Sequence, residues 1–157
     1  MRKQIIHPSG EGAASEPASW LDLERLASVE ITSEMAERPI EAALLPGAGA
    51  GWQAAEPGTQ TIRIVFDQPR TLTRIRLEFT EEQQVRTQEF VLRWLPAGAA
   101  SAREVVRQQF NFSPPATTHE LEDYRVELAG VQALELEIVP DLDRGDARAC
   151  LAALRLA

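Results

Sequence analysis

Apolar and polar residues alternate with a period close to two along most of the chain. The alternation is clearest in the segments 60–67, 72–79 and 134–138, where Ile, Leu and Phe recur at every second position. A period of two turns one row of side chains toward a core and the other row toward water. Each of these segments is therefore predicted to be a half-buried strand of an antiparallel sheet.

Further segments share this pattern, and turn residues separate them from their neighbours. These additional predicted strands cover residues 28–32, 87–95, 121–128 and 151–156. Pro69, within 67–70, and Gly130 are expected to lie in turns that end strands. Proline in particular cannot donate a hydrogen bond to a sheet ladder.

Two short stretches interrupt the alternation and are predicted to be helical turns. Residues 19–26 carry Ser19 as a candidate N-cap and Asp22 in the first turn, where the helix dipole favours a negative charge. Residues 39–45 begin with a proline, and Pro46 follows them directly. This placement is typical of a short helical turn, because proline suits the first position of a helix and does not continue one.

The segment 102–110 fits two patterns. Ser101 and Glu104 form a capping-box pattern that could open a helix. Against a helix, Phe110 and Phe112 alternate with polar residues as in a strand. Aromatic pairs suit a pleated sheet, so we predict a strand here.

About eight short strands with one or two short helices indicate an all-β domain. We expect an antiparallel β-sandwich of the jelly-roll kind, because strands at this spacing bury their apolar faces in two layers. A length of 157 residues suits one domain with its own core. That domain is assigned to residues 19–157. Residues 1–18 are rich in Gly, Ser, Ala and Pro and are expected to be a flexible N-terminal extension.

The charge balance and the cysteine count limit which binding partners and which cellular compartment are expected for this protein. A net charge of −8 disfavours nucleic acid and anionic membranes, since both attract clustered Lys or Arg. Cys150 is the only cysteine, so we expect no disulfide framework and a small buried residue rather than a nucleophile. No apolar run is long enough for a signal peptide or a membrane span, and we therefore expect a cytoplasmic protein.

No sequence pattern points to catalysis, and neither an enzyme activity nor a cofactor is expected. His7 and His119 lie far apart, and no nucleophile, phosphate-binding or zinc-protease motif is present. The acidic stretch 141–146 is similar to the start of a calcium loop. However, position 12 of such a loop is Ala152 here, where a bidentate Glu is needed. A solvated turn without a metal is the favoured interpretation.

The three tryptophans are expected to stabilise the fold. Trp94 shares a face with Phe90 and Leu92, which places it in the core. Trp52 is expected to close one end of the sandwich, and Trp20 to hold the N-terminal turn against the sheet. Stacking of an indole plane on a sugar ring is the alternative role for these side chains.

A series of segments runs in a characteristic order through residues 28–157. The segments are 29–32, 40–44, 51–52, 60–67, 72–77, 90–94, 134–138 and 154–156. In this order and spacing the chain resembles the discoidin, or coagulation factor 5/8 type C, domain family. The resemblance implies a galactose-binding-like β-sandwich that binds its ligand at one loop end. Family members with a structural calcium carry carboxylates in the first long connection, but 45–50 has none, so no metal is expected.

Connections between antiparallel strands alternate between the two ends of a sandwich. The turns near Pro69, 96–100 and Gly130 are expected at one end. The opposite end, called here the loop end, is expected to gather the loops 47–52, 80–86, 113–118 and 141–148. Function tends to reside on loops that a rigid scaffold holds, so this end is the candidate binding site.

Five side chains of the loop end suit a polar ligand. They are Arg86, His119, Asp141, Asp143 and Arg148. Guanidinium, imidazole and carboxylate groups can hydrogen-bond adjacent hydroxyl groups of a sugar. Arg86 and His119 are expected to face solvent and to contribute little to stability. A plain polar surface is the alternative interpretation of this group.

Two functions are compatible with the sequence. The first is a non-catalytic module that binds a carbohydrate or another small polar ligand, which the resemblance implies. The second is an intracellular protein–protein interaction domain, as in the X-ray repair scaffold proteins, whose N-terminal domain has the same fold. An exposed aromatic residue at the loop end would favour a sugar, and a flat apolar patch on a sheet face would favour a protein partner.

Overall fold

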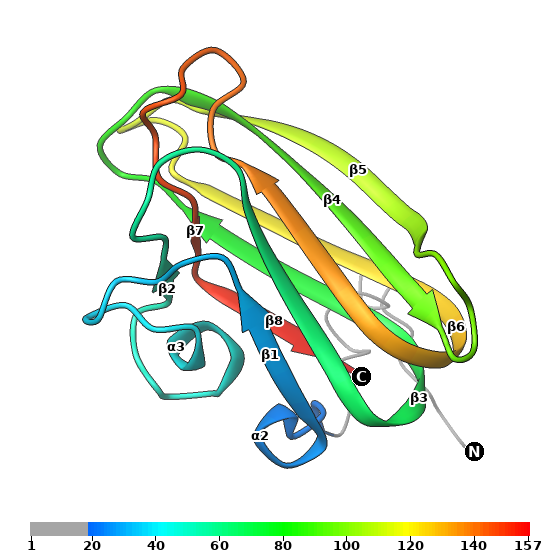
Figure 1. The fold of residues 1–157 in the computed structure, drawn as a ribbon. Coiled ribbons are helices and arrows are strands. Elements are labelled where there is room, and N and C mark those ends of the chain that lie inside the picture. Colours follow the sequence, from blue (N-terminus) through cyan, green and yellow to red (C-terminus); the bar gives the residue numbers. More distant parts are fainter. Residues whose placement is uncertain (1–18) are drawn as a thin grey trace, which may run out of the picture.

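The computed structural model describes residues 19–157, which form a two-layered β-structure (Figure 1). The elements of this part of the chain are α2 (Leu23–Leu26), β1 (Ala27–Ile31), α3 (Glu41–Leu44), β2 (Trp52–Gln53), β3 (Gln60–Thr80), β4 (Arg86–Pro96), β5 (Arg103–Phe112), β6 (His119–Val139), β7 (Cys150–Leu151) and β8 (Ala153–Leu156). Neighbouring strands pair antiparallel throughout. This confirms the predicted all-β antiparallel sandwich. The predicted extension 1–18 lies outside the described residues.

Two long strands, β3 and β6, run through both layers and connect them (Figure 1). The first half of β3 and the second half of β6 lie in the five-stranded layer β1-β3-β6-β4-β5. The other halves pair with each other in a second layer, where β8 pairs with β3. A short ladder of β2 and β7 lies apart from both layers.

The turns predicted around Pro69 and Gly130 are wrong, because the chain bends there without leaving the sheet. β3 continues through 67–70, with register shifts against β6 between Val65 and Arg74. Such bulges bend a strand and leave residues without a ladder partner, so a proline is tolerated there. Gly130 lies inside β6 with a φ of 69°, a conformation that glycine adopts readily. Each pair of predicted short strands is therefore one long strand.

The apolar rows of the two layers face each other and form one core. Phe79, from the second half of β3, stacks on Phe90 of β4 with ring centroids 5.3 Å apart. Ile64 and Leu136, from the five-stranded layer, are each 1% exposed. The Phe79–Phe90 contact joins the layers directly, and it confirms the inward faces predicted from the alternation.

The helices are shorter than the predicted helical turns. Within 19–26, α2 begins after Asp22 and not after Ser19. The predicted cap at Ser19 is therefore wrong, since the backbone N–H of Leu21 donates to the Leu156 carbonyl at 2.8 Å. α3 lies within the predicted turn 39–45. No helix of residues 19–157 is long and apolar enough to cross a membrane.

The tryptophans mostly occupy the structural positions that were predicted. Trp52 is fully buried. The Trp20 ring centre lies 5.6 Å from the Arg74 guanidinium and 5.2 Å from that of Arg76, so it holds the N-terminal segment to β3. Trp94 is only partly buried and packs against the edge of the core. The predicted core position of Trp94 is therefore confirmed only in part.

The ambiguous segment 102–110 is a strand, as predicted. It belongs to β5, which pairs with β4 from Phe112 opposite Arg86 to Arg103 opposite Trp94. Phe110 packs edge-on against Phe112 with ring centroids 4.9 Å apart. The aromatic pair thus closes the side of the sandwich next to the edge strand.

Candidate functional site

Three of the four predicted loops, 80–86, 113–118 and 141–148, lie together at one end of the sandwich (Figure 1). The fourth, 47–52, borders this end through Ala50, which lines a hollow together with Glu81 and Arg148. Backbone hydrogen bonds connect the first three. The Glu81 N–H donates to the Thr118 carbonyl at 2.8 Å, and the Leu142 N–H donates to the Thr87 carbonyl at 2.8 Å. These bonds fix the loop end as one connected surface on the rigid sandwich.

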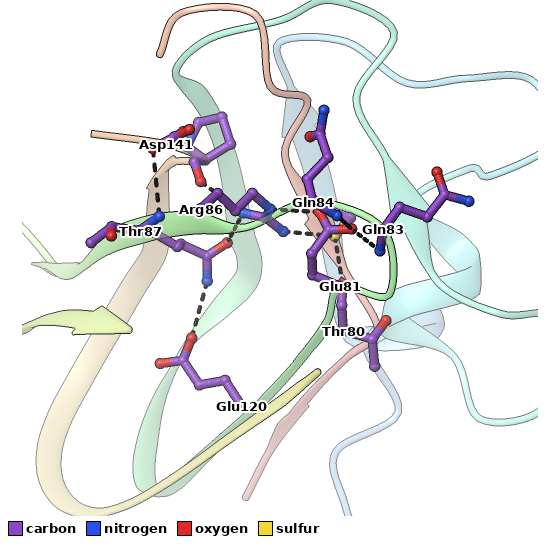
Figure 2. Close-up of polar contacts among 11 residues, drawn as sticks. Thr80, Glu81, Gln83, Gln84, Arg86, Thr87, Glu120 and Asp141 are labelled. Carbon is purple, nitrogen blue, oxygen red and sulfur yellow. Dashed lines mark hydrogen bonds and ion pairs between the residues drawn. The ribbon is translucent and has the colours of Figure 1, made fainter. Parts of the chain in front are cut away.

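Arg86 is the buried centre of the loop end (Figure 2). It is 3% exposed, and all of its side-chain nitrogen atoms have partners inside the protein. Nε donates to Glu81 Oε1 at 2.6 Å, and Nη1 donates to the Pro140 carbonyl at 2.7 Å and to Gln88 Oε1 at 3.2 Å. Nη2 lies 3.6 Å from Cys150 Sγ. The expectation that Arg86 faces solvent is therefore wrong.

The inward direction of Arg86 follows from its place in β4. Arg86, Gln88 and Phe90 occupy alternate positions of one strand, and all three are buried. The Arg86 guanidinium also lies 4.7 Å from the ring centre of Phe112 on β5. A buried charge persists only where it is paired and hydrogen-bonded. Arg86 thus holds the loops together from inside the protein.

Glu81 shapes the loop before β4 (Figure 2). Its Oε2 accepts hydrogen bonds from the backbone N–H groups of Gln83 at 3.0 Å and Gln84 at 3.2 Å, while Oε1 accepts from Arg86. Partial burial by itself would raise the pKa of Glu81. The hydrogen bonds outweigh burial and hold that pKa below its usual value.

Asp141 shapes the loop after β6 in a similar way. It is 8% exposed, and its Oδ1 accepts from the Asp143 N–H at 3.0 Å and from the Thr87 N–H at 3.5 Å. This arrangement is an Asx turn. Asp143 itself has an exposed side chain. No group of three or more His, Cys, Asp or Glu in residues 19–157 is arranged to hold a metal ion.

Two adjoining polar hollows open between the loops. The first has a volume of about 500 Å³ and is lined by Gln84, Val85, Arg86, Thr87, Asp141, Asp143, Arg144, Asp146 and Ala147. The second has a volume of about 550 Å³ and is lined by Arg38, Ala50, Gln53, Thr80, Glu81, Glu82, Gln83, Gln84, Asp146, Arg148 and Cys150. Gln84 and Asp146 border both hollows, so the two form one divided site.

Four of the five predicted site residues lie in these hollows. Arg86, Asp141 and Asp143 line the first hollow. Arg148 lines the second. The structure thus brings these four residues together at the loop end.

His119 borders neither hollow. It begins β6 opposite Thr80, and its Nε2 lies 3.4 Å from Glu78 Oε2 on the outer side of the second layer. His119 is exposed, as expected. Its position is therefore beside the loop end and not within the divided site.

Sequence reasoning missed several polar residues of the site whose side chains form no hydrogen bond within residues 19–157. The side chains of Gln53, Gln83, Gln84 and Asp146 line the hollows, and within residues 19–157 the fold gives them no hydrogen bond. The signal for two of them was present in the polar run 81–84 between two strands. Asp146 and Gln53 come close to this run only in the folded chain.

Cys150 lies in the wall of the second hollow but has a structural role. Its Sγ donates to the Thr80 carbonyl at 3.2 Å and contacts Arg86. Burial raises the pKa of the Cys150 thiol, although the positive charge of Arg86 opposes the shift. The thiol therefore stays protonated at neutral pH, and a protonated thiol is a poor nucleophile.

No protein-family model and no curated protein matches this sequence. Solved structures do match. The family 32 carbohydrate-binding module of AlyQ, in complex with 4,5-unsaturated mannuronic acid, has a TM-score of 0.60 and 14% identity, covering 84% of this chain and 95% of that one. An F5/8 type C domain from Bacteroides fragilis has a TM-score of 0.57 and 18% identity, covering 89% and 97%. The chain has the discoidin-like fold.

A third structure with the discoidin-like fold comes from C. perfringens. It is the family 32 carbohydrate-binding module of NanJ in complex with galactose, with a TM-score of 0.58 and 13% identity. The match covers 83% of this chain and 92% of that one. At such identities the likeness concerns the fold, and this confirms the galactose-binding-like sandwich that the resemblance implied.

Proposed function

We propose that this domain is a non-catalytic carbohydrate-binding module that takes its ligand at the loop end. The observation that carries the proposal is the divided polar site, whose lining includes side chains that the fold does not use. Sugar hydroxyl groups both donate and accept hydrogen bonds. Planar amide, carboxylate and guanidinium groups can each meet two of them at once.

The predicted site residues have two different roles in such a module. Arg86 and Asp141 are buried and position the loops before any ligand arrives. Asp143 and Arg148 are exposed and can contact the ligand directly. Gln84, which borders both hollows, would lie at the middle of the bound ligand. Loops that are already ordered lower the entropy cost of binding.

Structures with the same fold support the ligand class. Two of them are complexes with 4,5-unsaturated mannuronic acid and with galactose. The raised pKa of the Cys150 thiol gives no support to a catalytic role.

Apolar contact at this site would come from aliphatic side chains. Trp52 and Phe112 are fully buried, whereas Val85 is 73% exposed and Leu142 is 45% exposed. Among the described residues these are the exposed large apolar side chains of the loop end, so the exposed aromatic ring expected for a sugar site is absent there. The proposed binding therefore depends on hydrogen bonds more than on stacking.

A glycan array probed with the full chain, followed by calorimetry with the strongest ligand, tests the proposal. Gln84→Ala and Arg148→Ala should each weaken binding by about 1–3 kcal/mol, the range for a hydrogen bond to a charged or buried group. Arg103→Ala is the matched control, because this exposed arginine lies at the far end of β5. An array without any bound glycan, or a loss with Arg103→Ala alone, would contradict the proposal.

A second candidate function is a protein-interaction domain that uses the same end. The exposed aliphatic pair Val85 and Leu142 favours it. A cytoplasmic location stays a prediction that would suit this candidate, and cell fractionation tests it. Val85→Ser combined with Leu142→Ser should abolish binding to a protein partner. The same change should weaken a sugar far less than Arg148→Ala does.

The outer face of the five-stranded layer does not offer the flat apolar patch expected for a protein partner. Cross-strand ion pairs cover it instead. Arg63 pairs with Glu135 at 2.9 Å, Arg93 with Glu135 at 3.4 Å, and Arg107 with Glu89 at 2.7 Å. A partner docking there would have to desolvate these charges, so the loop end is the better candidate for either function.

A further inference from the structure

A buried carboxyl group lies beneath the loop end, inside the sandwich (Figure 2). Glu120, the second residue of β6, is 1% exposed. Its Oε1 accepts a hydrogen bond from Gln88 Nε2 at 3.1 Å, and its Oε2 is buried and accepts none. A carboxylate charge at such a place is very unfavourable unless a cation is paired with it directly.

The groups on β6 make the charged form of Glu120 less favourable still. Glu122 lies two residues along the same row and favours the protonated form of Glu120, first through a hydrogen bond between the two carboxyl groups and then through its like charge. Tyr124 follows in that row, and its hydroxyl group is also buried without a partner. On the neighbouring strand β3, the residue opposite Glu120 is Phe79, which has no charge to offer.

The groups on β4 only partly oppose this effect. Gln88 is neutral. The Arg86 guanidinium already forms an ion pair with Glu81, with 2.6 Å between Nε and Oε1. Burial, followed by the Glu122 carboxyl, raises the pKa of Glu120 to about 9, although the Gln88 hydrogen bond and the Arg86 charge act in the other direction. Glu120 is therefore neutral in the packed protein at neutral pH.

A chain of hydrogen bonds connects this carboxyl to the loops. Gln88 donates to Glu120 and accepts from Arg86 Nη1 at 3.2 Å. Arg86 in turn holds Glu81 in the loop 80–86 and the Pro140 carbonyl at the end of β6. A change at Glu120 therefore reaches two of the loops that line the divided site.

The start of β6 is the natural place for an opening. In the described residues, its first half, 119–128, pairs with β3 on one side and has no strand on the other. An edge segment that opens loses few contacts, and water then reaches the carboxyl group. The charged form can thus be accommodated without unfolding the sandwich.

We propose that Glu120 is a proton-operated switch for the loop end. While the carboxyl is neutral, it stays packed, and the Gln88–Arg86 chain holds the loops. When the carboxyl ionises, the start of β6 opens toward water and the loop 80–86 loosens. The switch belongs to the free protein and does not depend on the identity of any ligand.

Amide hydrogen exchange of the full chain, corrected for intrinsic exchange rates, tests the switch without a ligand. In the closed state the pKa of Glu120 is about 9, whereas in the open state it returns toward the ordinary 4.5. The closed state is therefore fully favoured below the open-state pKa. Its free-energy advantage over the open state decreases as pH rises toward the closed-state pKa. Protection of residues 119–122 and 81–86 should fall by up to about tenfold per pH unit in that window.

Glu120→Gln should remove this pH dependence. The neutral amide keeps an oxygen that can accept from Gln88, so both segments should stay protected at pH 8. Glu127→Gln is the matched control on an exposed site of the same strand and should keep the wild-type profile. Glu122→Gln removes the like charge and should move the upper limit of the window to lower pH. An unchanged slope in Glu120→Gln would overturn the proposal.

A direct titration covers the case in which Glu120→Gln does not fold. The side-chain carboxyl carbon of Glu120 in the wild-type chain can be followed by carbon-13 NMR. A midpoint several pH units above that of exposed glutamates, with exchange of residues 119–122 rising over the same range, supports the switch. A midpoint near the ordinary value would overturn it.

Discussion

Arg86 shows how one charged residue can serve the fold rather than a ligand. Its three side-chain nitrogens join strand β4 to the loop at Glu81, to the end of β6 at Pro140 and to β7 at Cys150. Removing the guanidinium would leave the largely buried Glu81 carboxylate without its counter-charge. The loss of one partner of such a pair costs far more than the pair contributes by itself.

Arg86→Ala should therefore lower the free energy of unfolding by about 3 kcal/mol, the lower end for a broken buried ion pair. Urea denaturation measures this change. Arg148→Ala at the same end is the control and should stay within about 0.5 kcal/mol of wild type, because the Arg148 side chain is exposed. Equal small effects in both variants would mean that the Arg86 network contributes little.

The elements of the loop end depend on close contacts between segments that are distant in sequence. Gly51, at the entrance to β2, has a φ of 111°. A Cβ atom there would lie 2.6 Å from the Leu151 carbonyl oxygen and 2.8 Å from the Ala152 Cα. The β2–β7 ladder, which carries one wall of the second hollow, therefore requires glycine at this position.

Gly51→Ala should destabilise the domain by about 2–4 kcal/mol, since overpacking adds to the cost of the backbone conformation. Gly98→Ala is the matched control. Its φ is also positive, at 79°, but a Cβ there would meet no atom within 4 Å. It should cost only about 1 kcal/mol. Thermal unfolding of both variants checks the difference, and equal costs would argue against a tight contact at β7.

Across the whole molecule, the pKa values of carboxyl groups shift in opposite directions. Hydrogen bonds from Arg74 and Arg76 hold the pKa of Asp123 below its usual value despite partial burial, and Glu81 behaves likewise. These groups stabilise the fold above their ordinary pKa, and that stability is lost as pH falls through the lowered value. Glu120 acts in reverse, and its contribution is lost as pH rises from 4.5 toward about 9.

The thermal midpoint should therefore be highest at about pH 5 and decline on both sides. Between pH 5.5 and 8 we expect a decrease of roughly 5–10 °C, from the linkage of one strongly shifted carboxyl in a chain of this size. Glu120→Gln should flatten the alkaline side and keep the acid side, which depends on Glu81 and Asp123. A wild-type midpoint that is constant from pH 5 to 8 would contradict this prediction.

Alternation along the chain determined most of the fold before any tertiary contact was known. Ile62, Ile64 and Phe66 lie on one face because neighbouring residues of a strand point to opposite sides, and this property is local. The gathering of the loops 80–86, 113–118 and 141–148 at one end also followed from the sequence, since antiparallel connections alternate between ends. These features need only the order of the strands.

The tertiary structure alone decided the direction and partners of the polar side chains. The partners of Arg86 lie 5, 54 and 64 residues away, at Glu81, Pro140 and Cys150. No local pattern reports whether such groups meet. The same holds for the bend of β3 at Pro69, where pairing with a distant strand continues through a residue that would end an isolated strand. Burial of charge and continuity of pairing are set by remote neighbours, and only the folded chain supplies them.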